Sequence, residues 1–126
     1  MVKTIKIGST EYDMKSSAYT VFAYKDQMGR DLLADISKIN DTYQEISKLP
    51  EEAQTGAWLN EITGVIEIAL KLAYIMIKEQ NKSFKEYDEW LKEIDAITGT
   101  ENSWIQEVME LAISPFLGRI QSSQNK

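Results

Sequence analysis

The sequence predicts an α+β fold that is mostly α: a short N-terminal β-hairpin followed by a bundle of about five helices. Residues 2–15 alternate between apolar and polar side chains, which is the period of a strand. Further along, apolar residues recur at helical spacing, most clearly over 52–80. A chain of 126 residues has the size of one domain. We therefore expect a single domain over 1–120, with the hairpin at 1–15 and helices at 17–120, and a polar flexible tail at 121–126.

The hairpin is predicted from its turn and from its cross-strand pairs. Gly8 and Ser9 separate the two alternating runs, and glycine tolerates the positive φ that a two-residue hairpin turn requires. In that register Ile5 faces Tyr12 on one side and Lys6 faces Glu11 on the other. Because a lone hairpin is marginal in water, it must pack on the helices or pair with strands of another copy.

Two helices are predicted next from their end signals. Ser17 or Thr20 can cap the first helix, and Gly29 suits its C-terminal stop. Asp31 can cap the second helix, and Pro50 closes it. The narrow apolar stripe of this second helix consists of Leu32, Ile36, Ile39, Tyr43 and Ile46.

The third helix, over about 52–80, is predicted to be the dominant element. Its apolar side comprises Trp58, Leu59, Ile62, Val65, Ile66, Ala69, Leu70, Leu72, Ala73, Met76 and Ile77. Ile68 and Ile75 widen that arc to about 220° of the helix circumference. Such an arc exceeds a one-sided stripe, so the helix is central to the fold or part of it faces a partner. We take Ile68 and Ile75 as partner-binding candidates.

Two more helices are predicted in the C-terminal third. Ser83 and Glu86 fit a capping box that opens a helix carrying Phe84, Tyr87, Leu91 and Ile94. Residues 98–100, Thr-Gly-Thr, read as a loop. The last helix carries Trp104, Ile105, Val108, Leu111 and Ala112. Pro115 is expected to end or kink it.

Composition excludes several classes of function. The net charge is −6 and the pI about 4.7, so phosphate backbones and anionic lipid would repel the chain. We therefore expect neither nucleic acid nor membrane as a partner. Without histidine or cysteine, the chain lacks the commonest general base, the commonest transition-metal ligand and any disulfide. The apolar run 62–77 is shorter than the ~20 residues of a membrane span, and no secretion signal opens the sequence, which indicates a cytoplasmic protein.

The best catalytic candidate is an acidic cluster, and it is weak. Glu86, Asp88, Glu89 and Glu93 lie close together on one predicted helix. Lysines interleave with them and form the i,i+4 pairs Lys85–Glu89 and Asp88–Lys92, which is typical of a solvated face. No glycine-rich phosphate loop is present. We expect no catalysis, no cofactor and no metal, and instead a protein that binds another protein.

Trp90 has two interpretations. It falls toward the edge of the stripe formed by Phe84, Tyr87, Leu91 and Ile94. It is either half-buried packing or an anchor in a partner interface, where tryptophan is enriched.

Two stretches resemble a known family. One is Ala23-Tyr-Lys-Asp-Gln-Met-Gly-Arg-Asp-Leu-Leu33 and the other Ser83-Phe-Lys-Glu-Tyr-Asp-Glu-Trp-Leu91. Following an N-terminal strand pair, they resemble the tail assembly chaperones of long-tailed bacteriophages and prophages, which carry a G-x-D-hydrophobic-hydrophobic junction and a Phe-x-x-hydrophobic-x-x-Trp-Leu helix. Met28 stands where family members often have an aromatic residue. Tyr24 and Leu33, within the first stretch, complete the partner-binding candidates.

The resemblance implies a non-catalytic role in virion assembly. Such a chaperone coats and solubilises the long helical tape measure protein, is displaced as tail tube subunits polymerise, and is not expected in the mature virion. It also implies self-association and a cytoplasmic location in an infected or lysogenic bacterium. Family members are often made in short and frameshifted long forms, and this chain would be the short form.

Two other functions are compatible with the sequence. One is a small structural tail or head-completion protein that oligomerises through its hairpin edge. The other is an acidic, helical, antitoxin-like regulator that neutralises a basic partner. Salt dependence of binding separates the regulator from a chaperone, and presence in finished particles identifies the structural protein.

Overall fold

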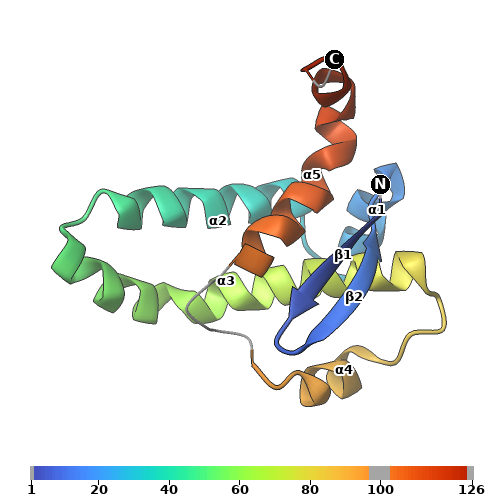
Figure 1. Cartoon of the computed structure of the whole chain (residues 1–126), viewed down its shortest axis with the longest axis horizontal. Coiled ribbons are helices and arrows are strands. Elements are labelled where there is room, and N and C mark those ends of the chain that lie inside the picture. Colours follow the sequence, from blue (N-terminus) through green and yellow to red (C-terminus); the bar gives the residue numbers. More distant parts are fainter. Residues whose placement is uncertain (1, 97–102, 125–126) are drawn as a thin grey trace.

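The computed structural model describes residues 2–96 and 103–124, with side chains through residue 96 and from 104 to 116. Figure 1 shows a two-stranded hairpin followed by five helices, which confirms the predicted fold class. The elements are β1 (Val2–Ile7), β2 (Thr10–Lys15), α1 (Ala18–Met28), α2 (Leu32–Ser47), α3 (Glu51–Gln80), α4 (Tyr87–Glu93) and α5 (Ser103–Gln124).

The hairpin has the predicted turn and register. β1 and β2 pair antiparallel with Ile5 opposite Tyr12 and Lys6 opposite Glu11. Gly8 has φ +66°, the left-handed conformation that the turn requires. The apolar side chains on the inward face, Ile5, Ile7, Tyr12 and Met14, are buried, and within the chain β2 packs on α3 while β1 contacts α5. The marginal two-stranded sheet is thus stabilised by the helices.

The ends of α1 form as the sequence predicts. Ser17 is the N-cap, and the Thr20 hydroxyl accepts the Ser17 N–H to complete a capping box. Glu79, near the end of α3, accepts hydrogen bonds from the hydroxyls of Ser17 and Thr20 at 2.5 and 2.7 Å. Gly29, with φ +67°, ends the helix. These contacts join the start of α1 to the end of α3.

Helix α3 is the centre of the fold. It contacts β2, α5, α1 and α2, so it is covered from several sides over its C-terminal half. Burial begins at Val65; the N-terminal half pairs with α2 to form a two-helix arm at one end of the molecule (Figure 1). The wide apolar arc therefore reflects a central helix. Ile68 and Ile75, which we expected on a partner face, are 4% and 1% exposed.

The helix predicted to open at Ser83 begins later, at Tyr87, and has no side-chain N-cap bond. The side chain of Asn81 accepts the Ser83 N–H at 3.1 Å, a local turn that competes with a helix start. Side chains of α3 also donate hydrogen bonds to backbone carbonyls of this segment. The Tyr74 hydroxyl donates to the Lys85 carbonyl, and the Lys78 ammonium donates to those of residues 82 and 84.

Pro115 does not end α5, which continues to Gln124 and so includes residues 121–124. Proline cannot donate a hydrogen bond to the Leu111 carbonyl. The hydroxyl of Ser114 donates to that carbonyl at 2.7 Å, and it also lies 3.1 Å from the hydroxyl of Ser16. The backbone thus tolerates the proline. The predicted loop at 98–100 lies outside the described residues.

Candidate partner-binding site

Of the five predicted partner-binding residues, the fold leaves one accessible. Tyr24 and Trp90 are fully buried, and Ile68 and Ile75 nearly so. Leu33 is 48% exposed on the first turn of α2. In this conformation the four buried side chains support the fold, and only Leu33 can contact a partner directly.

Tyr24 connects α1 to α2 through a buried carboxylate. Its hydroxyl donates to Oδ2 of Asp35 at 2.7 Å, and Arg30 pairs with both oxygens of Asp35 through Nε at 2.6 Å and an Nη at 3.0 Å. Burial opposes charge on Asp35, but hydrogen bonds from Arg30 and Tyr24 outweigh it and lower the pKa of Asp35. Burial and the adjacent carboxylate raise the pKa of Tyr24. This triad fixes the angle at which α2 leaves α1.

Trp90 fastens the short helix α4 to the fold. Its ring contacts four aromatic rings at centroid distances of 5.7 to 6.3 Å: Tyr12, Tyr74, Phe84 and Tyr87. Its indole N–H has no hydrogen-bond partner among the described residues. Asp95, just beyond α4, accepts hydrogen bonds from the Ser9 N–H and hydroxyl, which lowers its pKa and attaches the segment to the hairpin turn. Trp90 is therefore packing.

An apolar groove between α2 and α5 surrounds Leu33. Leu33 and Ile36 line one wall, and Met109 and Ile113 line the other. The rest of the lining is polar: Ser37, Asn40, Gln106 and Glu110. Phe116, 49% exposed, follows Ile113 by three residues and extends the α5 row. Two apolar rows at helical spacing thus face an opening that no third element of the described residues lines.

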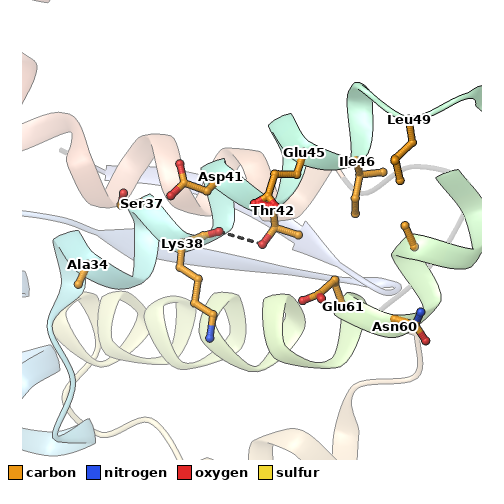
Figure 2. Close-up of a pocket in the computed structure, with 11 residues that line it drawn as sticks. Ala34, Ser37, Lys38, Asp41, Thr42, Glu45, Ile46, Leu49, Asn60 and Glu61 are labelled. Carbon is orange, nitrogen blue, oxygen red and sulfur yellow. Dashed lines mark hydrogen bonds between the residues drawn. The ribbon is translucent and has the colours of Figure 1, made fainter.

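A second opening separates α2 from α3 along the arm. Figure 2 shows carboxylates of Asp41, Glu45 and Glu61 around it, together with the single ammonium group of Lys38. The larger apolar side chains of the lining, Ile46 and Leu49, lie toward the tip. This cleft is predominantly acidic, in contrast to the apolar groove on the other side of α2. The two surfaces suit different partners.

The acidic residues on and beside α4 do not converge on a common point. Glu93 pairs with Lys85 and accepts a 3.5 Å hydrogen bond from Tyr12, whereas the sequence predicted a Lys85–Glu89 pair. Among the described residues no group of three or more carboxylates is arranged to hold a metal ion.

Sequence reasoning missed Met109 and Ile113. These residues form a second row on α5, beside the buried stripe that begins at Trp104 and Ile105. Their i,i+4 spacing, continued by Phe116 at i+7, was the available signal.

Comparison of the chain with protein-family models, with curated proteins and with solved structures finds no match. No helix in the described ranges is both long and apolar enough to cross a bilayer. The assignment of function therefore rests on the residues and surfaces of this chain.

Proposed function

We propose that this chain is a non-catalytic tail assembly chaperone that binds and solubilises the tape measure protein during phage tail morphogenesis. The observation that supports the proposal best is the groove between α2 and α5. Leu33, on one wall, is the accessible one of the five predicted partner-binding residues.

The lining of the groove suits the binding of a helix. Side chains from two helices form apolar rows, and a third helix can lay an apolar stripe between such rows. A tape measure protein presents long stripes of this kind. Burying a stripe removes apolar area from water at about 25 cal/mol per Å². The net charge of −6 would then keep coated assemblies apart in solution.

The proposal carries consequences for when and where the chain acts. It binds in the host cytoplasm, other copies bind along the same tape measure protein, and polymerising tail tube subunits displace them. The chain would therefore be absent from finished particles.

Co-expression tests the proposal. The tape measure protein encoded near this chain is expressed alone and with it, and the soluble fraction is measured. We expect insolubility alone and a soluble complex with the chain, at a molar ratio well above one chain per tape measure. An equally insoluble tape measure protein in both cultures would refute the function.

The acidic cleft of the arm favours a second candidate, an antitoxin-like regulator with a basic partner. Asp41, Glu45 and Glu61 outnumber Lys38 around that cleft. Binding there would weaken steeply with added salt because exposed charges are screened. Binding in the apolar groove would change little. Measuring the affinity for any isolated partner at low and high salt separates the two.

A further inference from the structure

A cationic hollow lies between α1 and the C-terminal end of α3. Lys15 at the end of β2, Lys78 on α3 and Lys82 just beyond α3 surround it. The remaining lining residues are Ser17, Tyr19, Ala23, Gln27, Ile75 and Glu79. These three lysines form no ion pair with any described residue, and unlike the unpaired lysines elsewhere they line one hollow together. Three unpaired ammonium groups thus gather in a chain of net charge −6.

One of the three charges is held in place. The half-buried Lys78 donates hydrogen bonds to the carbonyls of residues 82 and 84 at 3.1 and 3.2 Å, so its ammonium is positioned before any ligand arrives. A fixed charge costs less conformational entropy on binding than a free lysine side chain does. Lys15 and Lys82 are exposed, and their ammonium groups make no hydrogen bond to a described residue that would compete with a ligand.

The single acid in the lining does not neutralise these lysines. Both oxygens of Glu79 accept hydroxyl hydrogen bonds, one from Ser17 and the other from Thr20. Glu79 thereby serves the start of α1 and forms no ion pair with Lys78 or Lys82 within the described ranges.

The hollow also has apolar walls. Ala23 and Ile75 are buried at its sides, and Tyr19 stands at its edge with 60% of its surface exposed. Its volume of about 550 Å³ is large enough for several side chains. Carboxylates carried on short apolar stems fit this combination of fixed cations, apolar walls and an exposed aromatic ring.

We propose that this hollow binds an acidic segment of another polypeptide, with Lys15, Lys78 and Lys82 contacting its carboxylates and Tyr19 packing on its stems. A phosphate backbone is a poor match because the negative charge of the whole chain repels a long polyanion. A short peptide is subject mainly to the local cations, since at physiological salt charges beyond about 8 Å are largely screened. The hollow shares no lining residue with the α2–α5 groove, so the proposal does not depend on the chaperone assignment.

Fluorescence anisotropy with the full chain tests the inference. The probe is a fluorescein-labelled peptide rich in Glu and Asp, and the control peptide carries Gln and Asn instead. We expect the acidic peptide to bind, and the double substitution Lys15→Glu with Lys82→Glu to weaken it at least about tenfold, from two lost charge contacts. The matched control, Lys48→Glu with Lys92→Glu, changes the net charge equally on exposed lysines outside the hollow.

Three results would overturn the inference. Equal weakening by both double variants would mean that only net charge matters. Equal binding of the control peptide would remove the role of carboxylates. If inorganic phosphate displaced the peptide at a concentration equal to that of the peptide, the hollow would be a general anion site and not a peptide site. If the Glu variant unfolds, the milder double substitution Lys15→Gln with Lys82→Gln replaces it. Binding to the wild-type chain can also be followed by the change that the peptide causes in the amide chemical shifts of Tyr19, Gln27 and Lys82.

Discussion

Tyr24 donates a 2.7 Å hydrogen bond to Asp35 across the junction between α1 and α2. The two lie eleven positions apart in the sequence, and Gly29 ends one helix between them. Arg30 donates two hydrogen bonds to the same carboxylate, which therefore accepts from both Tyr24 and Arg30. Because Leu33 lies on the first turn of α2, this triad determines where one wall of the apolar groove stands.

Replacing Asp35 should destabilise the fold. In Asp35→Ala the hydroxyl of Tyr24 and the guanidinium of Arg30 both lose their partner, so we expect unfolding to become about 2–3 kcal/mol easier. Asp41→Ala, on the same helix but exposed and without an ion pair or side-chain hydrogen bond to any described residue, should change stability by less than about 0.5 kcal/mol. Urea unfolding followed by circular dichroism gives both values, and equal effects would show that the triad adds nothing.

The same carboxylate should make stability depend on pH. The pKa of Asp35 is lower in the folded chain than its ordinary value, so its contribution is present above that ordinary value and is lost as pH falls through the folded pKa. The difference in unfolding free energy between wild type and Asp35→Asn should therefore shrink from pH 7 to below about pH 4. A difference that stays constant over this range would contradict the lowered pKa.

Charged substitutions in the centre of α3 should unfold the chain. Lysine at Ile68 or Ile75 would bury an unpaired charge, at a cost of more than about 3 kcal/mol. Leu59→Lys, at a side chain 71% exposed on the same helix, should be neutral within about 0.5 kcal/mol. Thermal denaturation checks this, and soluble, fully helical Ile75→Lys protein would return that residue to the partner-binding candidates.

Two glycines in α3 are predicted to be replaceable with a gain. Added Cβ atoms at Gly56 and Gly64 meet nothing within 4 Å, so alanine should stabilise the helix by about 0.5–1 kcal/mol at each site. Gly8→Ala should destabilise, because φ there is +66° and a Cβ would collide with the Asp95 side chain and lie 2.9 Å from the Ala96 carbonyl oxygen. The melting temperature should therefore rise for Gly56→Ala and Gly64→Ala and fall for Gly8→Ala.

Local chemistry explains what could be predicted from sequence. The Gly8-Ser9 turn and the alternation around it determine the hairpin register, and Ser17 and Gly29 mark the ends of α1 because their neighbours in sequence are also their partners. At Ser83 the same reasoning failed, because Tyr74 and Lys78 reach from α3 to carbonyls that a helix would use. Hydrogen bonds donated by a preceding helix leave no signal in the residues that cap the next one.

The candidate site shows the same division. Periodicity measures how wide the apolar arc of α3 is, but it does not say which elements cover Ile68 and Ile75. The groove pairs Leu33 and Ile36 with Met109 and Ile113, more than seventy positions along the chain. A second row on α5 was visible in sequence, but its apposition to α2 arises only from the tertiary fold.

The most direct test of the central claim measures how much tape measure protein co-purifies with groove variants of this chain. Leu33→Lys and Ile113→Glu place a charge on each wall, and Leu59→Lys is the matched control at an exposed apolar residue of the arm. Helicity of each purified variant is checked first by circular dichroism. The account predicts that both groove variants lose at least about tenfold in affinity, because part of the apolar stripe of the tape measure protein would stay exposed to water. The control should bind like wild type. Undiminished binding by folded Leu33→Lys and Ile113→Glu would contradict it.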